Sequence, residues 1–361
     1  MNFNAPLLKP IRILLFPFSL VYALVVRVRN FFYDKGILAS ASFSIPLIGV
    51  GNLAAGGTGK STMVEFLIRS LKEHFRLAVL SRGYKRRTRG YSLAHSGVTA
   101  LEIGDEPMLF HTKFPDVSIA VGEERLLAIP QLLHDKPDTE VILLDDAFQH
   151  RSIRAGLNII LTEYSNLYVH DWYLPTGDLR DNPYRINEAH IVVVTKCPAD
   201  MTHAAGQKIE KELKLQSSQT LLFSSIRYGI PYQLTTRVEK ALDMATEVLL
   251  VTGIANPQPL KQYLHAHTGT YYEMLFADHH IFTIDDWKEV VRRYDSIVSE
   301  RKMLLTTEKD AVRLLKFGKE LEKHPIYALP IRMDWLFGGE EVFLQLIRTY
   351  IQNNRKASTA A

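Results

Sequence analysis

The sequence predicts an α/β protein in which a mostly parallel sheet is flanked by helices and is followed by a second, smaller α/β domain. Apolar runs suited to buried strands alternate with stretches of helical spacing along most of the chain. A glycine-rich segment directly follows the first of these strands. At 361 residues the chain exceeds the length at which a single core stops growing, about 250–300 residues.

The first set of elements predicts a core domain over residues 36–225. Strands are expected at 45–50, 76–80, 117–121, 141–145, 157–162 and 190–195, with helices near 61–73, 106–113 and 123–134. A connecting segment, 226–245, leads to the smaller domain, 246–361. There we expect strands near 247–252, 271–276, 303–306 and 326–330, and helices near 258–266, 285–299, 308–316 and 339–353.

Residues 1–35 form a separate N-terminal segment that contains an almost unbroken apolar run from Ile13 to Val26. This segment carries the net charge of +4 of the whole chain, so the remainder sums to zero. The run is shorter than the roughly 20 residues of a spanning helix, and Pro17 lies inside it. We expect a membrane-associating helix that lies in the interface, with its cations at anionic headgroups. A helix packed on the protein itself and a short, tilted span are the alternatives.

Composition excludes several other classes of protein. With 47% hydrophobic and 23% charged residues, the chain is not disordered throughout. The neutral remainder gives no support for nucleic-acid binding. The single cysteine, Cys197, excludes an intramolecular disulfide framework and fits a reducing compartment.

The most specific local signal is the glycine-rich segment between strand 45–50 and helix 61–73. It reads Gly51-Asn-Leu-Ala-Ala-Gly-Gly-Thr-Gly-Lys-Ser61. Such a loop wraps backbone N–H groups around nucleotide phosphates, and its glycines allow close approach. Lys60 would reach the β/γ-phosphates of the nucleotide, and the Ser61 hydroxyl would ligate Mg²⁺. The expected nucleotide-binding residues are Ala54, Ala55, Gly56, Gly57, Thr58, Gly59, Lys60 and Ser61, although the strict pattern has glycine in place of Ala54.

Asp145 and Asp146 end the apolar strand 141–145. A phosphate-loop enzyme places its second Mg²⁺-binding element at such a point. Because neighbouring strand residues point to opposite sides, we expect only one of the two to face the metal directly. The other would hold a water or orient a loop, and a solvated strand end is the alternative.

Two further loops carry candidate groups, one before a predicted helix and one after a predicted strand. Gly104-Asp-Glu-Pro107 opens a helix, so Asp105 is either its N-cap or a group aimed into the cleft. Ser81-Arg-Gly-Tyr84 opens a basic loop, Arg82–Arg89, of the kind that suits an anionic ligand, and a merely solvated loop is the alternative.

Two other motifs give weaker indications. Asp278-His-His280 offers a general base or an orienting group rather than a metal site, since adjacent histidines point differently. Thr195-Lys-Cys-Pro-Ala-Asp200 differs in residue type and spacing from the guanine-reading motif of GTPases, which argues against guanine specificity.

Together these motifs resemble those of the tetraacyldisaccharide 4′-kinase family, the lipid A 4′-kinases of Gram-negative bacteria. The similarity runs nearly end to end. It rests on Val50-Gly-Asn-Leu, Gly56-Gly-Thr-Gly-Lys-Ser61, Ser81-Arg-Gly-Tyr84, Gly104-Asp-Glu-Pro107, Asp145-Asp-Ala-Phe-Gln-His150, Leu179-Arg180, Val251-Thr-Gly-Ile254, Asp278-His279 and Thr307-Glu-Lys-Asp-Ala-Val312. The coupling of the phosphate loop to Asp-Asp-x-x-Gln-His and Thr-Glu-Lys-Asp-Ala is the most specific part.

The resemblance implies ATP-dependent phosphorylation of the 4′-hydroxyl of tetraacyldisaccharide 1-phosphate, which gives lipid IV-A. It further implies a catalytic dyad of Asp105, which accepts or orients the hydroxyl proton, and His279, which tunes its basicity and geometry. Lys60, Arg180 and Mg²⁺ would neutralise the transferring group. The family pattern has Arg-Glu where this chain has Arg180-Asp181, and the shorter carboxylate argues against a metal role for Asp181.

A substrate with four acyl chains places the enzyme at a membrane surface, here the cytoplasmic face of the bacterial inner membrane. The expected partners are that surface and the acylated disaccharide, with no nucleic acid and no obligate protein partner. The Arg82–Arg89 loop is the candidate site for the 1-phosphate. The alternative function is a membrane-associated phosphate-loop NTPase switch. It requires a base-reading motif and a residue that positions the hydrolytic water, and the sequence offers neither convincingly.

Overall fold

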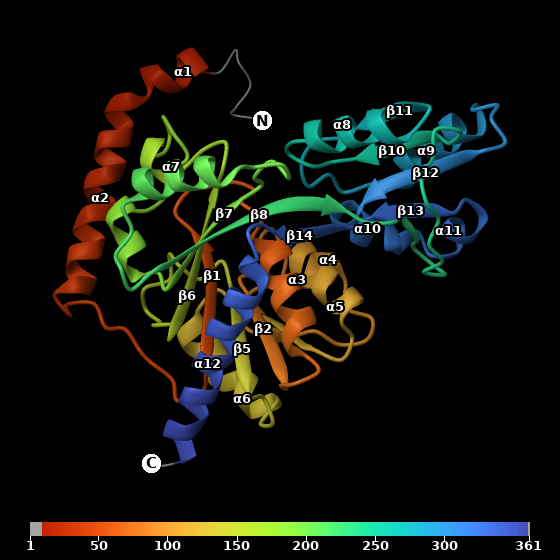
Figure 1. The fold of residues 1–361 in the computed structure, drawn as a ribbon. Helices are drawn as coiled ribbons and strands as arrows, with labels where there is room; N and C mark the ends of the chain where they lie inside the picture. Colours follow the sequence, from red (N-terminus) through yellow and green to blue (C-terminus); the bar gives the residue numbers. More distant parts are fainter. Residues whose placement is uncertain (1–8, 360–361) are drawn as a thin grey trace. The chain divides into compact units, whose positions relative to one another are not determined.

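The computed structural model describes residues 9–359 and divides into two compact units (Figure 1). The larger unit holds the described residues up to Ile226 together with 333–359, and the smaller unit holds Arg227–Arg332. The predicted boundaries differ from this division in two places. Residues 333–359, which we assigned to the smaller domain, return to the larger unit, and most of the predicted connecting segment belongs to the smaller one.

The larger unit is built on a nine-stranded sheet. Its spatial order is β14 (Ile331–Trp335), β8 (Thr220–Tyr228), β7 (Ile191–Thr195), β6 (Leu157–Glu163), β1 (Leu47–Asn52), β5 (Val141–Asp145), β2 (Leu77–Ser81), β4 (Ser118–Val121) and β3 (Ser92–Leu93). The pairs from β8 across to β4 are parallel, and the short β3 pairs antiparallel to β4. The structure also contains β3, β8 and β14, which we did not predict. Their sequences lack a clear strand pattern because they are short or mix polar with apolar residues.

Helices cover both faces of this sheet. One face packs against α3 (Lys60–Leu71), α5 (Asp105–Lys113) and α12 (Gly339–Thr359). The other packs against α6 (Arg125–Asp135) and α7 (His203–Leu213), the latter absent from our prediction. Short elements complete the unit: α4 (Ala100–Ile103), η2 (Tyr168–His170) and η3 (Pro183–Glu188).

Helix α12 shows why the C-terminal segment belongs to the larger unit. Phe343, Ile347 and Ile351 recur every four residues, so they form one stripe along the helix, and all three are fully buried. They share a core with Ile48 and Val50 of β1. The helical periodicity was readable from the sequence, but the sheet that covers it was not.

The register of the central strands places the candidate site at one edge of the sheet. In the parallel pair β1·β5, Val50 lies opposite Asp145. The glycine-rich loop and the two carboxylates therefore leave neighbouring strands side by side. In open parallel sheets, ligands bind at this carboxyl edge.

The N-terminal helices are α1 (Lys9–Leu14) and α2 (Phe16–Asp34). Three polar residues of α2, Ser19, Tyr22 and Asn30, bond to the rest of the larger unit. Ser19, Val26 and Asn30 are the buried residues of α2. The outward side is apolar and includes Phe18, Leu20, Val21, Leu24, Val25, Val28, Phe31 and Phe32. Within residues 9–359, no helix combines the length and apolar character needed to cross a bilayer.

The smaller unit contains a five-stranded sheet with helices on both faces. Its order is β11 (Thr270–Leu275), β10 (Glu247–Thr252), β12 (Lys302–Thr307), β13 (Ile326–Leu329) and β9 (Tyr232–Gln233), with only the β13·β9 pair antiparallel. Its helices are α8 (Gln258–His267), α9 (Ile284–Asp295), α10 (Glu308–Leu314) and α11 (Lys319–Lys323), with a 3₁₀ turn, η4 (Leu315–Phe317). Every strand predicted for this region from 247 onward is present.

The single thiol reports on the integrity of the larger unit. Cys197 is buried, and burial raises the pKa of its thiol to about 11. We expect labelling by a thiol reagent at pH 8 to be slower than in the urea-unfolded chain by about a hundredfold or more, because the thiolate is the nucleophile. Stopped-flow labelling with a chromogenic disulfide checks this. Equal rates in the folded and unfolded chains would contradict the burial.

Candidate active site

The glycine-rich loop joins β1 to α3 and takes backbone conformations that require glycine. Gly56 and Gly59 have φ values of 117° and 89°, in the region that disfavours other residues. A Cβ at Gly56 or Gly57 would meet no protein atom within 4 Å, so this part of the loop faces open space. The loop leads straight into α3, which begins at Lys60 and presents its first N–H groups there.

Hydrogen bonds from neighbouring segments fix the loop on both sides of Gly56 and Gly57. Asn52 donates its side-chain amide to the Thr58 hydroxyl at 2.8 Å, and the Thr195 hydroxyl donates to the Thr58 carbonyl at 2.8 Å. The Ala55 N–H donates to the Asp178 carbonyl at 2.6 Å, and Ala54 forms an antiparallel bridge with Leu179. Ala54 is buried in this bridge, which explains why a small residue other than glycine serves at that position.

Asp145 is the more deeply buried of the two adjacent carboxylates. Its side chain is 1% exposed, and Oδ2 accepts a hydrogen bond from the Ser81 hydroxyl at 2.9 Å. Among the described residues, Oδ1 has no hydrogen-bond partner. Burial, together with the charges of Glu106 and Asp146, raises the pKa of Asp145 to about 7. A cation at Oδ1 would compensate the buried charge.

Asp146 is held by two cations and takes a left-handed conformation, with φ at 49°. Arg180 forms a two-pronged ion pair with its carboxylate, and the Lys60 Nζ lies 3.5 Å from Oδ1. Burial alone would raise the pKa of Asp146, but Lys60 and Arg180 outweigh it and hold the pKa well below the usual range. Burial also lowers the pKa of Lys60, in spite of Asp146.

Helix α5 brings two further acidic residues to the same edge. The N-cap is Gly104, with φ at 93°, and Asp105 is the first residue of the helix rather than its cap. Of the two readings of Asp105, the structure therefore excludes the N-cap. The next residue, Glu106, accepts a hydrogen bond from the Ser61 hydroxyl at 2.6 Å.

A hydroxyl and carboxylates therefore gather beside the phosphate loop. Within residues 9–359, no three His, Cys, Asp or Glu side chains converge as a metal cluster. Mg²⁺ does not need one, because it uses one or two carboxylates together with waters and substrate phosphates. The Ser61 hydroxyl and the unpartnered Asp145 oxygen have the hard donor chemistry that fits this ion.

Asp181 takes no part in this cluster. It is 1% exposed, pairs with Arg185, and accepts hydrogen bonds from the Asn30 side chain and the Asn182 N–H, both at 2.8 Å. Its oxygens tie α2 to the loop before η3.

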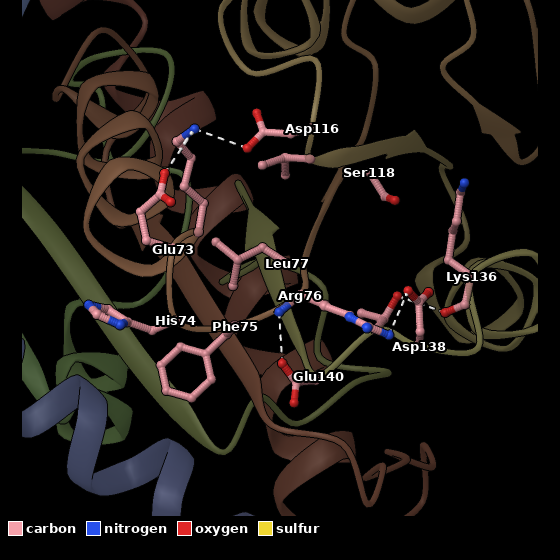
Figure 2. Close-up of a pocket in the computed structure, with 13 residues that line it drawn as sticks. Glu73, His74, Phe75, Arg76, Leu77, Asp116, Ser118, Lys136, Asp138 and Glu140 are labelled. Atoms are coloured by element: carbon pink, nitrogen blue, oxygen red, sulfur yellow. Dashed lines mark hydrogen bonds and ion pairs between the residues drawn. The ribbon is translucent and has the colours of Figure 1, made fainter.

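Two cavities lie outside the cluster. One, of 530 Å³, opens at the amino ends of β2, β4 and β5, the opposite edge from the phosphate loop (Figure 2). Its charges are largely paired, as between Lys72 and Asp116 or Arg76 and Asp138. The residues that line this cavity are therefore too far from the phosphate loop to contact a nucleotide bound there.

The second cavity, of 660 Å³, lies beside the C-terminal end of α2 and is rich in arginine. Arg125, which is 1% exposed, donates to the Leu80 and Asp145 carbonyls at its inner end. Burial, followed by the charges of Arg125 and Arg82, lowers the pKa of His150 to about 4. His150 is therefore neutral at physiological pH, and the cavity is basic because of its arginines.

His279 belongs to the smaller unit, where it follows β11 with φ at 63°. The other predicted catalytic residues, Asp105, Lys60 and Arg180, all lie in the larger unit. We did not predict a role for three residues that contact Ser61 or Asp145, namely Glu106, Arg125 and Ser81. The signals were present, since Glu106 and Ser81 lie in motifs already singled out, but only the fold shows what they touch.

Comparison with known proteins agrees with this geometry. A family model for tetraacyldisaccharide-1-P 4′-kinase (LpxK) matches residues 11–352. The chain is 44% identical to tetraacyldisaccharide 4′-kinase of Bacteroides thetaiotaomicron, over 96% of this chain and 94% of the relative. It belongs to the tetraacyldisaccharide 4′-kinase family. The Flavobacterium johnsoniae member is 42% identical, over 95% of this chain and 98% of the relative.

A solved tetraacyldisaccharide 4′-kinase supports the same assignment. The fold is similar to that of "apo" form LpxK from Aquifex aeolicus in complex with ATP, with a TM-score of 0.73 and 29% identity. The match covers 94% of this chain and 99% of that one. The predicted family, the phosphate-loop α/β fold and the class of phosphotransferase that acts on a hydroxyl group are thereby confirmed.

The structural role of Asp181 can be tested by an isosteric change. Asp181→Asn removes one of the two carboxylates that compensate the buried Arg185 and leaves only Glu188, at 2.8 Å. We expect the free energy of unfolding to fall by about 3 kcal/mol, the lower end for a broken buried pair. Urea denaturation measures it. The control, Asp116→Asn, removes a half-exposed partner of Lys72 and should cost less than about 1 kcal/mol. Equal losses would contradict a structural role.

Proposed function

We propose that this chain transfers the γ-phosphate of ATP to the 4′-hydroxyl of tetraacyldisaccharide 1-phosphate and so makes lipid IV-A. The observation that carries the proposal is the gathering of Lys60, Ser61, Asp145 and Asp146 at one sheet edge in a chain of this family. In the reaction the hydroxyl oxygen forms a bond to the γ-phosphorus. The bond from that phosphorus to the β–γ bridging oxygen breaks, and ADP leaves with its electron pair.

The phosphate loop and two cations would bind and orient the triphosphate. Gly56, Gly57 and Gly59 give the backbone close access, and Lys60 and Arg180 supply positive charge. In the structure both cations engage Asp146. Nucleotide binding would let the Lys60 ammonium exchange part of this contact for phosphate oxygens.

Ser61 and Asp145 would hold Mg²⁺ because their oxygens are hard donors. Asp146 follows Asp145 in the chain, and Glu106 is bonded to Ser61. When bound, this ion neutralises charge on the phosphates and helps to align them. Asp145 must be ionised to serve as a ligand, so its raised pKa favours metal binding above neutral pH.

Asp105 would accept the proton of the 4′-hydroxyl or orient that hydroxyl for in-line attack. Its position at the start of α5, next to Glu106 and hence to Ser61, supports this role. The family resemblance supplies the second member of the dyad, His279. The Arg82–Arg89 loop stays our candidate for the 1-phosphate, but Arg86 is bonded to Glu123 and Gly90, so the exposed Arg82, Lys85, Arg87 and Arg89 would do the binding.

We further propose that α2 lies in the interface of the membrane that holds the acylated substrate, on the cytoplasmic face of the inner membrane. The helix turns Ser19 and Asn30 to the protein, with Val26 as its one buried apolar residue, and leaves its other large apolar residues largely outward, unlike a helix that only completes a soluble fold. Ser19, Tyr22 and Asn30 bond to the larger unit at 2.7 to 3.0 Å. The exposed side chains are left for the acyl boundary.

The activity is tested with γ-labelled ATP and tetraacyldisaccharide 1-phosphate in detergent micelles. We expect label in the lipid with wild type and a loss in kcat of about 10²- to 10⁴-fold in Asp105→Ala, the usual range for a general base. Asp138→Ala, at the cavity of Figure 2, is the matched control and should keep full activity.

Each other result of this assay has a distinct meaning. Label found only as free phosphate, with or without lipid, would overturn the lipid kinase in favour of an NTPase switch. Equal lipid transfer by wild type and Asp105→Ala would keep the reaction and remove Asp105 from the role of base.

The membrane proposal is tested by placing charge on the outward side of α2. Leu24 and Val28 are one turn apart and are 61% and 44% exposed. We expect the double change Leu24→Glu/Val28→Glu to weaken partition into phosphatidylethanolamine–phosphatidylglycerol vesicles by about tenfold or more, because two apolar contacts become charged. Val298→Glu, at an exposed apolar position of the smaller unit, is the control. Sedimentation with vesicles gives the partition, and unchanged binding of the double variant would refute the docking surface.

A further inference from the structure

His279 sits in a tightly specified turn of the smaller unit. Its backbone N–H donates to the Gly253 carbonyl at 3.1 Å, just beyond the end of β10. A Cβ at Gly253 would lie 2.8 Å from the Ala277 carbonyl oxygen, so only glycine permits this approach. These contacts fix the backbone of the turn and so limit where the ring of His279 can lie.

The ring is contacted by an arginine from a different element. Arg313, near the end of α10, places Nη2 3.0 Å from Nδ1 of His279. The arginine side chain is only 7% exposed. The Asp278 carboxylate lies on the other side of the ring, 3.8 Å from Nε2.

Asp310 holds Arg313 in place. One carboxylate oxygen of Asp310, a fully buried residue, accepts from Arg313 Nη1 at 2.9 Å. The other accepts from the Thr252 and Thr307 hydroxyls, both at 2.8 Å, and from the Gly253 N–H at 3.1 Å. The same aspartate therefore fixes both the arginine and the backbone segment to which His279 is bonded. These contacts give a role to Thr307 and Asp310 of the Thr-Glu-Lys-Asp-Ala motif, which the proposed function does not use.

The chemistry of the two groups decides the state of the imidazole. A guanidinium has N–H donors and no acceptor, and it stays charged in proteins. Nδ1 must therefore offer its lone pair to Arg313, and a neutral ring then carries its proton on Nε2. A proton on Nδ1 would face a donor and a positive charge.

From this we infer that Arg313, braced by Asp310, is a positioning residue that keeps His279 as the neutral Nε2–H tautomer. The inference deepens the proposed function and rests on it for its consequence. A histidine in this state presents a hydrogen-bond donor at Nε2, so it can orient a carboxylate but cannot take a proton at Nδ1. The proton of the 4′-hydroxyl then passes to an Asp105 oxygen, and His279 keeps its own.

The tautomer is measured directly on the full-length protein with ¹⁵N-labelled histidine. Long-range ¹H–¹⁵N spectra distinguish the Nδ1–H, Nε2–H and imidazolium forms, and His279→Gln assigns the signal. At pH 7.5 we expect wild type to show Nε2–H, and Arg313→Ala to lose that pattern. A wild-type ring that is Nδ1–H or imidazolium would overturn the inference, as would an unchanged pattern in Arg313→Ala.

A conservative variant separates positioning from folding. The ammonium group introduced by Arg313→Lys is also a donor without an acceptor, so this variant should restore the Nε2–H pattern and part of the activity. We expect kcat to fall by about 10- to 100-fold in Arg313→Ala and clearly less in Arg313→Lys, with KM for ATP within about twofold. If Arg313→Ala fails to fold, Arg313→Lys and wild type still decide the tautomer. A rise in KM with kcat unchanged in both variants would overturn the positioning role.

His280 provides the internal control. Its Nε2 lies 2.8 Å from the Asp286 carboxylate, and its ring stacks on Phe276 at 4.7 Å. Its signal should not change with Arg313, and a change in both histidines would show a general disturbance of the turn and overturn a specific role for Arg313. Because the spectra need no substrate, a chain with the expected tautomer and no lipid phosphorylation would refute the proposed function while leaving the tautomer assignment standing.

Discussion

Two neighbouring carboxylates at the end of a buried strand are the constraint around which the larger unit is organised. Asp145 is buried and Asp146 beside it is partly exposed, and two adjacent carboxylates in such a site cannot both be charged without compensation. The structure compensates them unequally: Lys60 and Arg180 pair with Asp146, whereas Asp145 receives one hydroxyl and keeps an oxygen without a protein partner among the described residues. Asp146 is therefore held in its ionised form by its two cations, whereas one oxygen of Asp145 is left for the cation that we propose.

This arrangement also links the site to the N-terminal helix. Arg180, which binds Asp146, accepts a hydrogen bond at its carbonyl from Tyr22 of α2, and the next residue, Asp181, binds Asn30 of the same helix. Arg29 donates to the carbonyl of Gln149, three residues after Asp146. The segments that carry the active-site charges are thus the ones on which α2 rests, so the apolar side of α2 has a fixed place relative to the phosphate loop.

Sequence patterns predicted the parts of this molecule that depend on local rules. Buried parallel strands, the phosphate loop and the helix after it follow from apolar runs and glycine spacing, and the paired acids follow from their place at a strand end. What failed depends on distant contacts. Ile347 shows helical periodicity, but nothing local says that it completes the core of the first sheet. Likewise, only the fold shows that Arg86, within the loop that we propose for the 1-phosphate, is bonded to Glu123.

The smaller unit interrupts the larger one, because the chain leaves through β8 and returns through its neighbour β14. This has a consequence for synthesis. While a ribosome is still making residues 227–332, the larger unit lacks β14 and α12, and with them Phe343, Ile347 and Ile351 of its core. The inserted unit has its own sheet and core and is complete first. The larger unit, which is translated first, is thus the last to complete its fold. Its phosphate loop is translated early but stays attached to an incomplete sheet until α12 has been made.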